Sequence, residues 1–263
     1  LERASARETA ARVAAGSVAK ILLGHLGVDV ISHVVQMGPV ASKSTLRPGP
    51  ADLEQVDASQ VRCFDAEAEE AMVAEIKAAA KVGDSLGGVV EVIAYGVPVG
   101  LGSHVHWDRK LDGLLAQALL SIQAVKGVEI GDAADVAGRR GSEAHDPIGW
   151  DPELGEYTRE SNWSGGIEGG MTNGQPVVAR VAMKPLATLN RPVLKTVDVV
   201  TKEETVSFKE RTDVTAVPAM GVVAETMMAL VLANEAVRKF GGDSVVEMER
   251  NYRSYLAGLA DRA

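Results

Sequence analysis

The sequence has one cysteine, few aromatic residues and no excess of positive charge, and each shortage excludes a class of protein. The single cysteine, Cys63, excludes an internal disulfide and a metal site built from several thiolates. The net charge of −9 argues against a nucleic-acid partner, which needs a positive surface to displace counterions. No stretch reaches the ~18 consecutive apolar residues of a membrane span, so we expect no membrane partner. A reducing cytoplasm is the compartment that this composition predicts.

What the chain does contain is the composition of an ordinary globular protein. Its 263 residues are 46% hydrophobic, and nothing in the composition marks a domain boundary, so we expect a single domain over 1–263. Hydrophobic periodicity predicts helices at 6–26, 65–81, 111–126 (closed by Gly127), 218–240 and after 243, strands at 28–40, 89–99 and 177–183, and a hairpin at 193–206. We expect 41–50 and 131–175 to be mainly loop. Strands separated by unequal helices and long glycine-rich loops favour an α+β fold.

A first polar cluster lies in the segment Arg3-Ala4-Ser5-Ala6-Arg7-Glu8. Ser5 and Glu8 have the spacing of a capping box, which predicts a helix start. Free N–H groups at a helix start favour an anion, and two arginines add charged donors. The alternative is an ordinary capped helix with surface arginines.

A second cluster is the glycine-rich stretch 161–174, in which backbone can approach a ligand closely. It has neither the strand-then-helix glycine pattern of dinucleotide sites nor a Walker motif. A flexible surface loop is the alternative interpretation.

A third cluster combines Met183–Thr188 with Arg211-Thr212-Asp213. The strand that ends in Lys184-Pro185 places a cation at a loop, and Arg211 and Asp213 share one side of an extended chain. These residues could bind a polar ligand, or Arg211 and Asp213 could form a surface ion pair.

The histidines do not predict a metal site. His104 and His106 have the spacing of a ligand pair, and Asp108 could add an oxygen, but no further cluster completes the set. We therefore predict no metal. No Ser-His-Asp or Cys-His arrangement follows from the spacing either.

Taken in order, these clusters resemble the chorismate synthase family. The matching stretches run from the N-terminal segment almost to the last helix, and they are Arg3–Ala10, Gly83–Gly88, Gly96–Gly102, Ser121–Gly131, Ser161–Gly174, Met183–Pro185 and Arg211–Pro218. Any one of them alone is weak, whereas seven in the same order are specific.

The resemblance implies both a reaction and a fold. The family eliminates phosphate from 5-enolpyruvylshikimate 3-phosphate by an anti-1,4 route, giving chorismate at the end of the shikimate pathway. It uses reduced FMN without net redox change, and NADPH or an outside reductant reduces the flavin. The resemblance also implies a cytoplasmic homotetramer whose antiparallel sheets sandwich helices, present here in incomplete form.

The family's site residues carry over to matching positions. The resemblance implies FMN contacts from cations, glycine and turn residues, namely Arg3, Ala4, Ser5, Gln123, Ala124, Gly169, Lys184, Pro185, Leu186, Ala187, Thr188 and Arg211. Asp213 matches an aspartate that helps to pass on the proton taken from substrate. Ser5 becomes a second catalytic candidate as its relay partner, and Arg7 a candidate ligand of the substrate anion.

The chain also departs from the family pattern. The family's Gly-Glu-Ser-His-Gly motif, an early arginine pair and a second histidine ahead of the Arg3 segment are absent, and the first residue is Leu1 rather than methionine. We therefore expect a chain without its N-terminal segment, with little or no activity alone because those histidines are the family's general acids. The alternative function is a non-catalytic flavin- or anion-binding remnant, or a subunit fragment.

Overall fold

The computed structural model describes residues 2–153 and 155–260 of the chain. Its main element is a five-stranded antiparallel sheet in the order β2-β1-β3-β9-β4. The strands are β1 (Asp29–Met37), β2 (Val40–Ala41), β3 (Gly88–Tyr95), β4 (Val125–Ile130) and β9 (Val177–Met183). β-Branched residues dominate the central strands, as a sheet buried on both faces requires.

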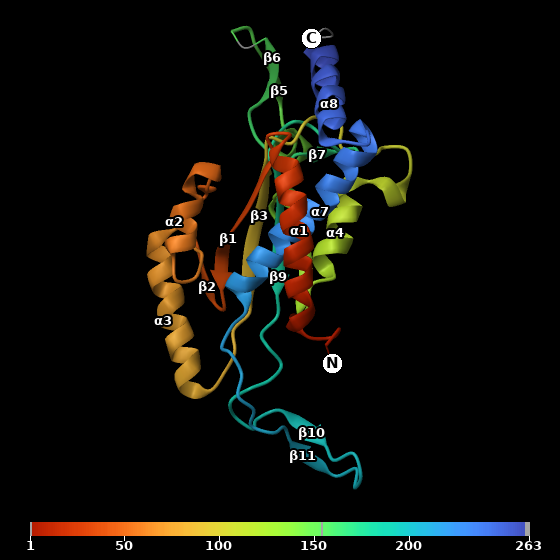
Figure 1. Ribbon diagram of the computed structural model, residues 1–263. Helices are drawn as coiled ribbons and strands as arrows, with labels where there is room; N and C mark the ends of the chain where they lie inside the picture. The colour runs from red at the N-terminus through yellow and green to blue at the C-terminus, as the bar shows by residue number, and fades with distance from the viewer. Residues whose placement is uncertain (1, 154, 261–263) are drawn as a thin grey trace.

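One face of the sheet is covered by three helices, α1 (Thr9–Gly24), α4 (Leu111–Leu120) and α7 (Val217–Phe240) (Figure 1). The long helix α7 packs on β1 and β3, and both α1 and α4 pack against α7. Met228 and Leu232, near the middle of α7, are fully buried. By length and composition α7 could cross a membrane, but 61% of its most apolar window is buried inside the molecule, as in the core helix of a folded domain.

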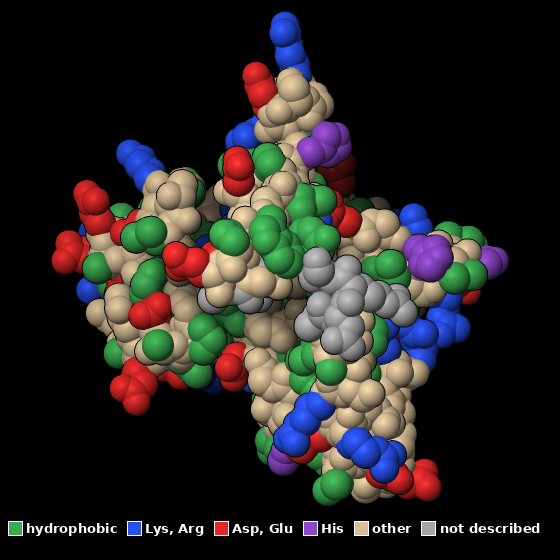
Figure 2. All heavy atoms as spheres, turned by 90° about the horizontal axis from the view of Figure 1, so that it is seen from above, with side chains coloured by type: hydrophobic (Ala, Val, Ile, Leu, Met, Phe, Trp, Pro, Cys, Tyr) green, Lys and Arg blue, Asp and Glu red, His purple; other side chains and the backbone are tan. Residues whose placement is uncertain are grey.

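Two further helices, α2 (Leu53–Ala58) and α3 (Ala66–Val82), lie beside β1 and β2 (Figure 1). Asp65 caps α3 by accepting hydrogen bonds from the N–H groups of Glu67 and Ala68, and Gly83 ends it with a left-handed backbone. Seen from above, this side of the molecule carries many acidic side chains (Figure 2). The predicted helix 65–81 and its stop at Gly83 are confirmed.

The remaining elements are short, apart from the last helix, α8 (Val245–Ala260). They are the single turns η1 (Ala6–Glu8), η2 (Pro50–Asp52), η3 (Trp107–Arg109), α5 (Ala133–Val136) and α6 (Gly141–Ala144), and three hairpins. The hairpins are β5–β6 (Ile148–Asp151 with Glu156–Arg159), β7–β8 (Ile167–Glu168 with Met171–Thr172) and β10–β11 (Lys195–Val197 with Glu204–Val206). The β10–β11 hairpin, predicted at 193–206, projects away from the sheet (Figure 1).

The predicted α+β class is confirmed, because an antiparallel sheet packs against a separate helical layer. The described residues contain one five-stranded sheet, and the other strands form two-stranded hairpins. Several boundaries differ. The strand expected over 28–40 breaks at a turn after Met37, and the strand expected over 89–99 ends at Tyr95. Residues 131–175 hold two hairpins and two helical turns within the expected loop.

The helix predicted over 111–126 is wrong in its second half. It ends at Leu120, and Val125–Ile130 instead forms β4, paired with β9. Between them Ala124 has a φ of 65°, which reverses the chain without a glycine. Gly127 is therefore a strand residue, and it does not close a helix.

Candidate functional site

The N-terminal segment forms a tight turn that leads into α1. Ser5 caps η1, where its hydroxyl accepts a hydrogen bond from the Arg7 N–H. The predicted capping box is not formed, because the Glu8 carboxylate turns instead to Arg12, whose Nε lies 2.8 Å from both carboxylate oxygens. Arg7 is exposed and pairs with Glu2 at 2.6 Å. Arg3 and Ala4 are exposed beside this turn.

The Gln123-Ala124 turn lies directly against this segment. Gln123 Nε2 donates a hydrogen bond to Glu8 Oε2 at 3.3 Å, and Arg12 Nη1 donates to Ser121 Oγ at 2.7 Å. Gln123 Oε1 is buried and has no hydrogen-bond partner within the described chain. Two of the predicted cofactor segments, far apart in sequence, are thus held together.

The end of β9 adds the third predicted segment. The Lys184 N–H donates to the carbonyl oxygen of Ala124 at 3.0 Å, which ties Lys184–Thr188 to the Gln123 turn. The Lys184 side chain is exposed. Since Lys184 follows β9 and Gln123 precedes β4, pairing of these two strands is what brings their ends together.

The loop 83–88 joins the Lys184 segment to the Asp213 segment. Ser85 Oγ donates to the carbonyl oxygen of Leu186 at 2.7 Å, and the Leu86 N–H donates to that of Val214 at 2.7 Å. Gly87 is packed so closely that a Cβ atom would lie 2.3 Å from the Met183 carbonyl oxygen. Glycine is therefore required by close approach at this crossing.

Arg211 and Asp213 are both exposed at the end of this chain of contacts. Within residues 2–153 and 155–260 they form no ion pair with each other, so the surface-pair interpretation of that cluster is not what the structure contains. The predicted residues Arg3 to Ser5, Gln123, Ala124, Lys184 to Thr188, Arg211 and Asp213 therefore belong to neighbouring segments.

Gly169 lies elsewhere. It is exposed on the β7–β8 hairpin, with a φ of 62° and open space where a side chain would be. The next residue, Gly170, accepts a hydrogen bond from the N–H of Leu111 at the start of α4, whereas Gln123 follows the end of α4. The ten residues of α4 span about 15 Å, so the structure does not bring Gly169 to the other predicted residues.

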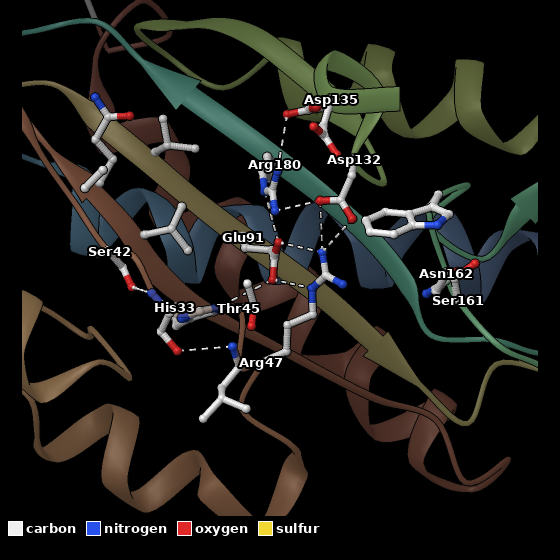
Figure 3. Close-up of a pocket in the computed structure, with 18 of the residues that line it drawn as sticks. His33, Ser42, Thr45, Arg47, Glu91, Asp132, Asp135, Ser161, Asn162 and Arg180 are labelled. Atoms are coloured by element: carbon white, nitrogen blue, oxygen red, sulfur yellow. Dashed lines mark hydrogen bonds and ion pairs between the residues drawn. The ribbon is translucent and has the colours of Figure 1, made fainter. Parts of the chain in front are cut away.

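A cavity of about 820 Å³ is also separate from these segments. It lies on the sheet face opposite α7 and is lined by β1, β3, β4, β9 and the loops 41–47 and 160–163 (Figure 3). The strand register places His33, Glu91, Arg180 and Glu129 in one row across four strands. No predicted site residue lines this cavity among the described residues.

Glu91 is the centre of that row. It is buried, accepts a 2.8 Å bond from Arg47 Nε and a 3.1 Å bond from Arg180 Nε, and lies 3.5 Å from His33 Nε2. Burial alone would raise its pKa, but these hydrogen bonds and the two arginine charges lower the pKa of Glu91 to about 2. Arg47 and Arg180 also pair with Asp132, at 3.3 and 2.7 Å. The ion pairs satisfy one another, which is the arrangement of a structural network.

This network was not predicted from the sequence, although the sequence contains a signal for it. Glu91 and Arg180 are single charges inside otherwise apolar strands, and a buried strand charge needs an opposite partner. What the sequence cannot supply is the register that sets them side by side.

Of the candidate metal ligands His104, His106 and Asp108, two are in contact. His106 Nδ1 lies 3.1 Å from Asp108 Oδ1, and both side chains are exposed. Across the described parts of the chain, no three His, Cys, Asp or Glu side chains are grouped as a metal would require. The absence of a metal site stays a prediction.

The comparisons with known proteins agree with one another. The chorismate synthase family model matches residues 1–237. The chain is 60% identical over 263 residues to a chorismate synthase of Salinispora tropica and 59% identical over 266 residues to one of Saccharopolyspora erythraea. Both alignments cover 100% of this chain and 66% of the relative, so the chain spans just under two thirds of the length of these curated relatives.

A solved structure is similar over nearly the whole chain. A crystal structure of chorismate synthase superposes with a TM-score of 0.83 at 42% sequence identity, covering 98% of this chain and 71% of that one. Family model, curated relatives and fold thus lead to the same conclusion, and the chain belongs to the chorismate synthase family.

Proposed function

We propose that the protein is a chorismate synthase, a carbon–oxygen lyase that eliminates phosphate from 5-enolpyruvylshikimate 3-phosphate by an anti-1,4 route. The reaction ends the shikimate pathway and uses reduced FMN without net redox change. Family membership supports the reaction class. The single observation that carries the proposal to this chain is the contact chain from Glu8 through Gln123 and Ala124 to Lys184.

We call the neighbouring segments 3–8, 123–124, 184–188 and 211–213 the junction. The residues at the junction fit FMN. Phosphate needs cations and N–H donors, and Arg3, Lys184 and Arg211 form no ion pair with any described part of the chain. A flavin also offers N–H and hydroxyl donors, and the buried Gln123 Oε1 is an acceptor without a partner. The exposed residues Pro185 and Ala187 add a surface for the ring.

Separate residues of the chain have separate roles in the proposed reaction. Reduced FMN, when bound, would lend an electron that helps to expel phosphate and regain it as hydrogen leaves the ring. The Asp213 carboxylate helps to pass on the proton taken from the substrate, with the Ser5 hydroxyl as its relay partner. Arg7 binds a substrate anion after releasing Glu2, and this largely exposed ion pair costs little to break.

Assembly and location complete the proposal. We propose a cytoplasmic homotetramer, with NADPH or an outside reductant supplying the electrons for the flavin. The β10–β11 hairpin supports self-association, because Val197 and Val206 share one face with Lys195 and Glu204 and are 56 and 52% exposed, and Phe208 just beyond the hairpin is 87% exposed. A two-stranded hairpin is only marginally stable in water, so its exposed valines favour a partner surface.

Titration of the chain with FMN, followed by flavin fluorescence, tests the proposal before turnover does. The 263 residues lack the Gly-Glu-Ser-His-Gly motif, so binding is the more direct question. We expect saturable binding that tightens when the phosphorylated substrate is added. Arg211→Ala should weaken binding about tenfold, the value of one charge-assisted hydrogen bond.

Asp213→Ala is the matched variant for that titration. It removes the carboxylate proposed to pass on the proton, so it should leave FMN affinity within about twofold while abolishing any chorismate formation. Lack of FMN binding by the unaltered chain, or equal affinity for Arg211→Ala, would contradict the site.

A further inference from the structure

The contact between Glu8 and Gln123 fixes the orientation of the Gln123 side-chain amide as well as its position. A carboxylate only accepts hydrogen bonds, whereas a glutamine amide has a donor end and an acceptor end. Because Gln123 bonds to Glu8 at 3.3 Å, its Nε2 end must face Glu8, and Oε1 must point the other way. That oxygen is the buried acceptor without a described partner.

Glu8 is itself held in place. Arg12 binds both of its oxygens through Nε at 2.8 Å and extends Nη1 to Ser121, two residues before Gln123. The hydrogen bond from Arg12 lowers the pKa of Glu8, burial opposes this, and Gln123 and the charge of Arg3 lower it further. The groups facing Glu8 therefore keep it ionised, the state in which it is an acceptor alone.

We propose that Glu8 is a positioning residue that fixes the polarity of the Gln123 amide, so that this subsite offers an acceptor and takes a hydrogen-bond donor of the ligand. The inference rests on the proposed function for the ligand being FMN. It assigns a ring N–H or a hydroxyl of the flavin to Gln123. It places the phosphate away from this residue, among the cations of the junction.

The side chains of Glu8 and Gln123 have the same length and differ only in their terminal group, a carboxylate or an amide. Their roles can therefore be exchanged by substitution. Glu8→Gln lets the Gln123 amide turn over, and Gln123→Glu sets two carboxylates face to face. The double variant Glu8→Gln/Gln123→Glu restores one donor and one acceptor at the contact, with the second oxygen of the new carboxylate still facing the ligand.

The test is a double-mutant cycle on FMN affinity measured by fluorescence. We expect each single variant to weaken binding about tenfold, as loss of one hydrogen bond to a buried acceptor predicts, and the double variant to recover to within about threefold of the unaltered protein. Glu249→Gln is the control, since Glu249 also pairs with an arginine four residues along its helix, 3.3 Å away. It should not change the affinity. Single variants without effect, or a double variant as weak as the product of the singles, would overturn the inference.

A second measurement separates this inference from the proposed function. In ligand-free protein, the side-chain amide NMR signal of Gln123 should shift in Glu8→Gln and stay unchanged in Glu249→Gln. If that response is present but the unaltered protein does not bind FMN, the proposed function fails and the positioning by Glu8 stands. If the Gln123 signal does not change in Glu8→Gln, the proposed positioning by Glu8 is wrong, whether or not the protein binds FMN.

Discussion

At the scale of single residues, Glu91 shows how much one buried charge depends on its neighbours. Its side chain is 3% exposed, and within the described residues its compensation comes from Arg47, Arg180 and His33. Removing one partner from such a network leaves the others buried without full compensation, which costs more than the network contributes in the first place.

Glu91→Gln should therefore lower the free energy of unfolding at pH 7 by about 2–4 kcal/mol. Urea unfolding measures the difference. Glu160→Gln is the matched control, because Glu160 lines the same cavity but is exposed, and its change should stay within about 0.5 kcal/mol.

The pH dependence of that difference follows from the sign of the shift. The pKa of Glu91 is about 2 in the folded protein, below the value of about 4.3 for an unfolded glutamate, so the ionised group stabilises the fold above the higher value. This contribution is lost as the pH falls from about 4.3 through about 2. A gap between the unaltered protein and Glu91→Gln that persists undiminished in acid would contradict the assignment.

At the scale of elements, the position of the junction depends on how α1 packs on α7. Gly16 allows the close approach, since a Cβ atom there would lie 2.2 Å from the Cβ of Thr226. Gly16→Ala should lower the free energy of unfolding by about 1–3 kcal/mol, because overpacking outweighs the better helix propensity of alanine.

Gly24→Ala, in the same helix, has no neighbour within 4 Å and provides the comparison. It should be neutral or stabilising by up to about 1 kcal/mol. Thermal unfolding measures the stability of both variants. Equal effects would mean that α1 and α7 can move apart without a loss of stability.

The helices α3 and α4 show which element boundaries can be predicted from the sequence and which cannot. Helix α3 could be predicted because its stop and cap signals, Asp65 and Gly83, lie beside its apolar stripe. The end of α4 could not, because Ile122 and Val125 continue its apolar spacing and the turn is made by Ala124 at φ 65°. Likewise, motifs pointed to the predicted flavin segments, but not to Glu8 or Arg12 as the residues that join them. Such contacts depend on tertiary pairing, which local patterns do not contain.

At the scale of the whole molecule, exposed apolar surface is concentrated where the chain leaves the sheet. The β10–β11 hairpin makes no substantial contact with another described element, and both its stems continue into predicted flavin segments, Lys184–Thr188 and Arg211–Asp213. Self-association through this hairpin would therefore hold both segments in place as well as bury its exposed valines. Assembly and cofactor binding are expected to be coupled.

Val206→Lys tests this coupling at the proposed interface. Val206 lies on the face of the hairpin that also carries Val197, and Thr205→Lys places the same charge on the opposite face of the same strand. Light scattering should give the unaltered protein and Thr205→Lys the mass of an assembly of 27.6 kDa chains, and Val206→Lys a smaller mass. FMN affinity should fall in Val206→Lys alone, because its stems lose their support. Equal masses for both variants would mean that the hairpin face takes no part in assembly, and a lower mass with unchanged FMN affinity would mean that assembly and the flavin segments are independent.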